Sequence, residues 1–465
     1  MQSLADTIIE ENTDAVKAML QYGVDVNQID EYGFTPLIEA AIADNFEIAN
    51  LLVNYHAAPN TQDMLGGTAL HWAAENNNVR LAELLLQHRA NPNAYNFSGQ
   101  PVLTMPLLRQ QTEIKKLLIK YGANLSFAQD YINTKLLGHM FELVGSANIV
   151  DPNNNFVEVD FEGFYLEFSL AIIGESLAQF ENHFAARQLR RYADLTRVII
   201  DVIARAAKLI KFQQYRVNTK KHQDEIHALI QQEPFIIPIG YEGHAITLIK
   251  FGNILVKCDR REDSRLFDNI MVYQMNRPKV MNSDFIQRLV FDKQSDDFIN
   301  THMETVLELV PVTELKVSAQ ISGNCSWANV EACIPALFFL LFSQVEDFTG
   351  NISRYKNLAL NFFNQWREWN KDRSLQFCIQ SFKTSNSIRK ATKAEILAAI
   401  LFQSCGGASP ADSERAESIL SVLTLPQYEH VLQNYIKSYC FEDHSEEGRN
   451  FLRLLKNYGY DTKIR

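Results

Sequence analysis

The feature that most constrains this chain is a motif that returns at a fixed interval along its N-terminal segment. Asp30-Glu-Tyr-Gly-Phe-Thr-Pro-Leu37 recurs as Asp63-Met-Leu-Gly-Gly-Thr-Ala-Leu70, and more loosely as Asn96-Phe-Ser-Gly-Gln-Pro-Val-Leu103. The glycines at 33, 66 and 99 lie 33 residues apart (66−33 and 99−66). The same step separates the leucines at 51, 84 and 117 and the asparagines at 27, 60 and 93. Such a period predicts stacked supersecondary units, each covering the apolar face of its neighbour.

The repeat resembles the ankyrin repeat in its period and in the Thr-Pro-Leu opening at residues 35–37. Proline is tolerated at the first position of a helix, and the alanine pairs at 40–41 and 73–74 let paired helices approach closely. We predict four units, 1–29, 30–62, 63–95 and 96–128, the first a degenerate N-terminal cap. The resemblance implies that a host protein binds at the hairpin tips; the alternative is that the array only packs on the next domain. The candidate tip residues are Glu31, Tyr32, Met64, Leu65, Asn96 and Phe97.

A second informative stretch is Gln320-Ile-Ser-Gly-Asn-Cys-Ser-Trp-Ala-Asn329, which precedes an apolar run over residues 330–342. The pattern predicts a loop followed by a helix, with Cys325 near the helix N-terminus. The helix dipole favours an anion there, so the thiol should ionise near neutral pH. The side chain of Gln320 can donate to a developing oxyanion.

Residues 235–259 supply partners for such a thiol. They predict a strand, a turn, a second strand that begins near His244, a hairpin turn at Gly252-Asn253 and a third strand that ends near Asp259. A two-residue hairpin pairs residue i with 505−i, which places Asp259 opposite Ile246, one diagonal step from His244. Asp259 can then orient the imidazole while His244 takes the thiol proton.

Each of these residues also has an ordinary structural interpretation. A histidine on a strand is usually structural, and a cysteine before an apolar helix is usually a small buried hydrophobe. Asp259 lies in the charged segment 257–263 and can be a surface charge. The combination and order of the residues favour a catalytic constellation.

The order His244, Asp259, Gln320, Cys325 resembles the cysteine peptidases of the adenain and ubiquitin-like-protease type (clan CE). The resemblance implies that His244 is the base, Asp259 its orienter, Gln320 the oxyanion donor and Cys325 the nucleophile. It implies hydrolysis of peptide or isopeptide bonds, with a ubiquitin-like protein among the possible substrates. The alternatives are an acyltransferase that uses the same residues and a non-catalytic scaffold that binds host proteins.

An ankyrin array fused to such a domain resembles bacterial effectors that enter eukaryotic cells, where the cytoplasm and the nucleus are both candidate compartments. The acidic segment Glu442-Asp-His-Ser-Glu-Glu447 resembles the C-terminal signal of type IV secretion substrates. The alternative for this segment is a solvated loop.

Composition narrows the remaining function classes. The net charge of −11 argues against direct nucleic-acid binding. The six cysteines form no CxxC pair, and neither a metal site nor a cofactor is expected. The apolar runs are too short or interrupted for a membrane span.

We therefore expect a multidomain chain: an all-α ankyrin solenoid (1–128), a helical connector or insertion (129–234), an α+β cysteine-protease-like core (235–345) and a helical C-terminal region (346–465).

Overall fold

The computed structural model describes residues 3–30, 33–213, 219–261, 270–321, 323–345, 351–406, 409–442 and 446–460. The chain divides into two compact units. The first comprises Met1–Leu136, Ser146–Asp160 and Phe382–Leu397, and the second comprises Leu137–Gly145, Phe161–Ser381 and Ala398–Arg465.

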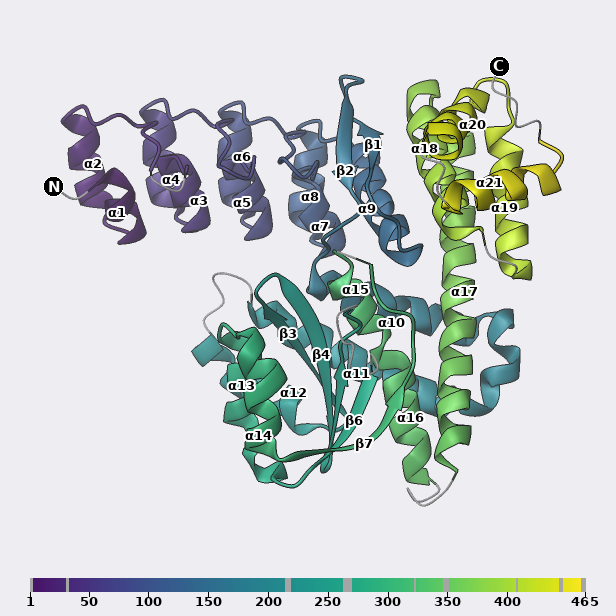
Figure 1. Ribbon diagram of the computed structural model, residues 1–465. Helices are drawn as coiled ribbons and strands as arrows, with labels where there is room; N and C mark the ends of the chain where they lie inside the picture. The colour runs from purple at the N-terminus through teal and green to yellow at the C-terminus, as the bar shows by residue number, and fades with distance from the viewer. Residues whose placement is uncertain are drawn as a thin grey trace. The chain divides into compact units, whose positions relative to one another are not determined.

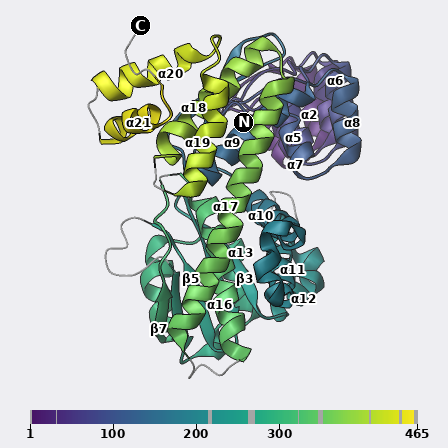
Figure 2. The same ribbon diagram turned by 90° about the vertical axis from the view of Figure 1, so that its right-hand side faces the viewer.

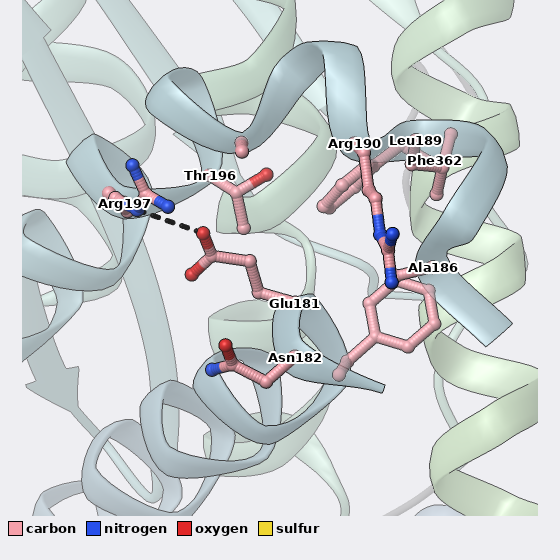
Figure 3. Close-up of a pocket in the computed structure, with 10 residues that line it drawn as sticks. Glu181, Asn182, Ala186, Leu189, Arg190, Thr196, Arg197 and Phe362 are labelled. Carbon is pink, nitrogen blue, oxygen red and sulfur yellow. Dashed lines mark ion pairs between the residues drawn. The ribbon is translucent and has the colours of Figure 1, made fainter. Parts of the chain in front are cut away.

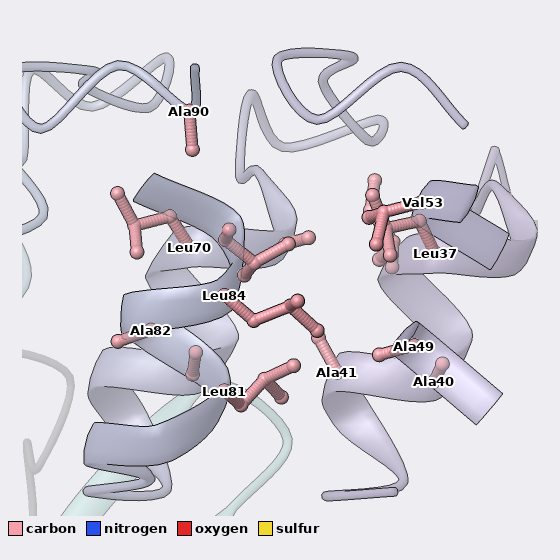
Figure 4. Close-up of a cluster of buried hydrophobic side chains, with 14 of the residues drawn as sticks. Leu37, Ala40, Ala41, Ala49, Val53, Leu70, Leu81, Ala82, Leu84 and Ala90 are labelled. Carbon is pink, nitrogen blue, oxygen red and sulfur yellow. The ribbon is translucent and has the colours of Figure 1, made fainter. Parts of the chain in front are cut away.

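The first unit contains the predicted ankyrin array, which is confirmed as successive pairs of short antiparallel helices (Figure 1). Leu37, Leu70, Leu81 and their neighbours from adjacent pairs form one continuous apolar core (Figure 4). Thr35 caps its helix by accepting the backbone N–H of Ile38 at 3.2 Å. The helices are α1 (Leu4–Ile9), α2 (Thr13–Gln21), α3 (Pro36–Ile42), α4 (Phe46–Asn54), α5 (Ala69–Glu75), α6 (Val79–Gln87), α7 (Thr104–Leu108) and α8 (Thr112–Lys120).

The periodic asparagines tie each repeat to the next. The side-chain oxygens of Asn27, Asn60 and Asn93 accept backbone N–H groups of the following repeat at 2.8, 2.7 and 2.7 Å. These bonds satisfy loop N–H groups that would otherwise lack a partner in the protein.

A β-hairpin follows α9 (Leu125–Met140), within the segment 129–234 that the sequence had suggested to be a helical connector. Its strands are β1 (Ser146–Val150) and β2 (Phe156–Asp160). Val157 and Val159 point into a cluster with Phe127 and Tyr131, whereas alternate residues of β2 are exposed. This alternation is the strand signal that the sequence interpretation missed. The first unit also takes in the N-terminal part of α18 (Ser387–Ser404).

The second unit is built on a five-stranded antiparallel sheet in the order β3-β4-β5-β6-β7. Its strands are β3 (Phe235–Tyr241), β4 (His244–Phe251), β5 (Ile254–Cys258), β6 (Ile270–Met275) and β7 (Leu309–Leu315). The predicted register is confirmed, because Phe251 pairs with Ile254 and Thr247 with Cys258. The turn between β3 and β4 is Glu242-Gly243, whose φ angles of 46° and 78° match the positive values that a type I′ hairpin turn requires.

Helices cover both faces of this sheet (Figure 1). Apolar side chains of β3, β4 and β5 pack against α12 (Gln223–Gln231), α13 (Ser283–Phe291) and α14 (Met303–Leu307). On the other face, Thr247 of β4 contacts α15 (Cys325–Glu331) and α16 (Cys333–Val345). These contacts hold β4 against α15, the helix that begins at Cys325.

Further helices surround this core. The long helix α17 (Ile352–Thr384) is drawn in green in Figure 2. It packs against α16, where the rings of Phe338 and Phe362 stack with centroids 4.8 Å apart. The stretch Cys325–Ser343 is long and apolar enough to span a membrane, but 83% of it is buried in the fold, as in the core helix of a globular protein. Other α-helices described in the unit include α10 (Leu166–Asn182), α11 (Ala193–Ile210), α19 (Pro410–Leu423), α20 (Glu429–Tyr435) and α21 (Glu446–Asn457).

Candidate cysteine active site

Cys325 is the first residue of α15, as the sequence predicted. The loop before it is fixed by buried contacts: the side-chain oxygen of Asn324 lies 2.6 Å from Nδ1 of His139. Gly323 has a φ of +71°, and its carbonyl accepts the N–H of Gly163 at 2.9 Å. These two hydrogen bonds therefore anchor the residues that immediately precede the nucleophile candidate.

His244 and Asp259 come together at the mouth of the β4–β5 hairpin. Nε2 of His244 lies 3.0 Å from Oδ1 of Asp259, and the two side chains are 16% and 14% exposed. His244 opens β4, and Asp259 directly follows β5. Asp259 occupies Nε2, which leaves Nδ1 as the ring nitrogen that can interact with the thiol of Cys325.

The electrostatics of the three groups favour a thiolate–imidazolium pair. Burial raises the pKa of the Cys325 thiol, but hydrogen bonds from His244 and from the backbone N–H groups of Ala245 and Ser326 outweigh it and leave this pKa below its usual value. Burial lowers the pKa of His244, but hydrogen bonds and charge interactions with Asp259 and Cys325 raise it to about 9. Burial likewise disfavours the Asp259 carboxylate, yet its bond to His244 holds the pKa below the usual range.

Gln320 lies beside the same cluster. Its backbone N–H donates to the carbonyl of Arg260, the residue after Asp259, at 2.8 Å. The chain then needs only five residues to reach Cys325. The structure thus pairs His244 with Asp259 and bonds the backbone of Gln320 to the residue that follows Asp259.

A buried ion-pair network underlies the site. Arg260 is fully buried and lies 2.9 Å from Glu142 and 3.6 Å from Glu331. Arg367 reaches the same two carboxylates at 2.7 and 3.7 Å. Arg260 also donates to the carbonyl of Ser318 at 2.7 Å, which anchors the segment leading to Gln320.

Sequence reasoning missed two neighbours of the catalytic candidates. The ring of Tyr241 packs edge-on against His244, with centroids 5.6 Å apart. Arg261 lies 3.9 Å from Asp259 and 3.0 Å from Asp296, and it donates to the hydroxyl of Tyr241. The clue in the sequence was position alone: Tyr241 precedes the turn before His244, and Arg261 follows Asp259 by two residues.

The predicted ankyrin tips divide into exposed and structural residues. Met64, Leu65 and Phe97 are 68%, 74% and 71% exposed. Asn96 turns inward, and its side-chain oxygen accepts the N–H groups of Ser98 and Gln100 at 3.1 and 2.9 Å. Glu31 and Tyr32 lie outside the described residues.

A separate pocket of about 380 Å³ lies between α10 and α11 (Figure 3). Glu181 and Arg197 form an ion pair of 2.9 Å across it, and Arg190 lines another side. Neither cysteine nor histidine lines this pocket. Within the described part of the chain, no cluster of three or more metal-ligating side chains occurs.

Comparison with known proteins agrees with this architecture. A family model of ankyrin repeats in three copies matches residues 4–63 and 55–129. The chain is similar to the solved structure of the Legionella effector AnkH, with 39% identity over 99% of this chain and 98% of that one and a TM-score of 0.84. No curated protein sequence matches the chain.

Proposed function

The chain belongs to the family of the Legionella effector AnkH, and from this premise we propose that it acts as an effector in a host cell. In this proposal the ankyrin repeats bind a host protein, and Cys325 cleaves a peptide or isopeptide bond. The observation that carries the catalytic part is the 3.0 Å His244–Asp259 pair, supported by the influence of His244 on the pKa of the Cys325 thiol.

The reaction follows from the positions of these groups. The Cys325 thiolate attacks the substrate carbonyl carbon, and the side-chain N–H₂ of Gln320 donates to the oxyanion that forms. The imidazolium of His244 gives its proton to the leaving amine, which departs and leaves a thioester on Cys325. His244, now neutral, takes a proton from water as that water attacks the thioester. Collapse of the second intermediate releases the acid and restores the ion pair.

Partner binding is assigned to the exposed apolar residues of the ankyrin tips. Met64, Leu65 and Phe97 project from consecutive hairpins. Large exposed apolar side chains are better binding anchors than solvated charges. Replacing all three with serine should weaken capture of the host protein while the array remains folded.

Delivery into the host by type IV secretion is a further part of the proposal. It depends on the resemblance of the acidic segment at residues 442–447, of which Asp443, His444 and Ser445 lie outside the described residues. A translocation reporter fused to the chain should reach host cells, and replacing Glu446 and Glu447 with alanine should reduce that transfer.

The first experiment is labelling with electrophilic probes, followed by mass-spectrometric identification of the modified site. Iodoacetamide and ubiquitin-like proteins with a C-terminal electrophile should label Cys325, and His244→Ala or Asp259→Ala should slow this labelling. Cys440→Ser is the matched control and should change nothing at Cys325. Labelling that ignores both substitutions would favour a non-catalytic scaffold.

An acyltransferase shares every step up to the thioester. The two reactions differ in whether water or an acceptor amine attacks it. Incubation with an acyl donor and a candidate acceptor protein separates them, because only the transferase gives a mass increase on the acceptor.

A further inference from the structure

Asn329 is a buried amide one turn beyond Cys325 on the same helix. Its side chain is inaccessible to solvent, with 1% of the residue exposed. A buried amide has to satisfy its hydrogen-bonding groups within the protein. The partners that Asn329 uses all belong to segments that carry the candidate catalytic residues.

Three side-chain hydrogen bonds and one backbone hydrogen bond define its surroundings. Its Oδ1 accepts the backbone N–H of Arg260, the residue after Asp259, at 2.8 Å. Its Nδ2 donates to the carbonyl of Ala245, the residue after His244, at 2.7 Å, and to Oε1 of Gln320 at 3.4 Å. The carbonyl of Asn329 accepts from the hydroxyl of Thr247 at 2.7 Å, which fixes the backbone of the residue itself.

The orientation of the amide is fixed by its backbone partners. A flipped amide would point its oxygen at the Ala245 carbonyl and its N–H₂ at the Arg260 N–H, so both contacts would be repulsive. With the amide in the observed orientation, Nδ2 engages Oε1 of Gln320. The N–H₂ group of Gln320 then remains for an external acceptor.

We propose that Asn329 is a positioning residue for the Cys325 site: its single amide holds the strand of His244 against the segment of Asp259 and turns the Gln320 amide so that it can donate to an oxyanion. This inference rests on the proposed function. It assigns to Asn329 an effect on the ionisation of Cys325, because loosening Ala245 and Arg260 loosens the His244–Asp259 pair that stabilises the thiolate.

The test uses the isosteric variant Asn329→Asp in the full chain. Aspartate retains an acceptor for the Arg260 N–H but presents a second acceptor to Ala245 and Gln320. The rate of Cys325 labelling by iodoacetamide is measured from pH 5 to 10. We expect the midpoint to move up towards the ordinary thiol value of about 8.5, with roughly tenfold slower labelling at pH 7.5.

The matched control is Asn370→Asp, the same chemical change at another buried asparagine of the same unit. Asn370 is 1% exposed and accepts from Ser176 at 2.7 Å. This control should destabilise the fold without moving the labelling midpoint of Cys325. Should Asn329→Asp fail to fold, Asn329→Ala removes the same donors without burying a charge.

The outcomes separate this inference from the proposed function. If Asn329→Asp or Asn329→Ala shows the wild-type pH profile of Cys325 labelling, the positioning role is refuted. The proposal that Cys325 is a reactive cysteine is then unaffected. A wild-type Cys325 that labels no faster than the other cysteines overturns both.

Discussion

Replacing Asp259 with asparagine should raise the pH at which Cys325 becomes reactive. Asp259 is the main group that raises the pKa of His244, which is about 9 against an ordinary value of 6.5. The net difference of 9 − 6.5, or 2.5 units, corresponds to roughly 3 kcal/mol, to which Asp259 and Cys325 both contribute against the opposing effect of burial. Without that carboxylate the imidazolium fraction at pH 8 falls from about 90% towards about 3%.

The loss of imidazolium determines the expected labelling rate. A thiol with the ordinary pKa of about 8.5 is roughly one-tenth ionised at pH 7.5. Labelling of Cys325 in Asp259→Asn should therefore be about tenfold slower than in the wild type at pH 7.5. Above about pH 9.5 both proteins carry a thiolate, and the two rates should converge.

Mass spectrometry provides the assay because it reports each cysteine separately. The other five cysteines are buried, so their labelling in the same sample tests whether the fold has opened. Asp296→Asn is the matched control, since Asp296 pairs with Arg261 at 3.0 Å and leaves the His244–Asp259 bond intact. An unchanged profile in Asp259→Asn, or an equal shift in Asp296→Asn, would refute the reasoning.

Three other predictions concern stability. Because the pKa of His244 is raised to about 9 in the folded protein, the imidazolium contributes its full stabilisation below pH 6.5 and loses it as the pH rises through 9. The difference in unfolding free energy between the wild type and His244→Gln should therefore shrink over that pH range. Leu85 is 0% exposed in the ankyrin core, and Leu85→Ala should cost about 2–5 kcal/mol by denaturant unfolding, against less than about 0.5 kcal/mol for Leu65→Ala at a 74% exposed tip. Arg260→Leu should cost about 3–5 kcal/mol because it leaves Glu142 and Glu331 short of a buried partner, and adding Glu331→Leu should recover part of the loss.

The parts of the fold that could be predicted from sequence are those set by local periodicity. The 33-residue step determined the helix pairs, and the two-residue hairpin determined the register that brings Asp259 to His244. Both depend on residues close in sequence. The position of Cys325 at a helix start was predicted for the same reason, from the Ser-Gly-Asn turn and the apolar run after it.

The features that sequence reasoning missed depend on residues far apart in the chain. In the sequence, Arg260 is one of several charged residues in a polar segment. Its burial in the structure depends on its ion pair with Glu142, which lies 118 residues away in the chain. In the sequence, Asn329 is one polar residue in an apolar helix. In the structure, the hydrogen-bond partners of its side chain come from three other segments. The β1–β2 hairpin was missed for another reason: its two strands are short, and the sequence on both sides of them has a helical pattern.

The geometry also explains why the Cys325 site can be precise although its residues come from loops and element ends. His244, Asp259 and Cys325 each lie at the boundary of an element, where a backbone is normally least constrained. Here those boundaries are bonded to one another through buried groups: Asn324 to His139, Arg260 to Glu142 and Glu331, and Asn329 to Ala245. A buried charge network is weak evidence for stability, since an apolar core of equal volume would often serve as well. Under the proposed function, this network beside a thiol whose pKa is lowered would serve to hold Cys325, His244 and Asp259 in one geometry, which directional hydrogen bonds do better than apolar contacts.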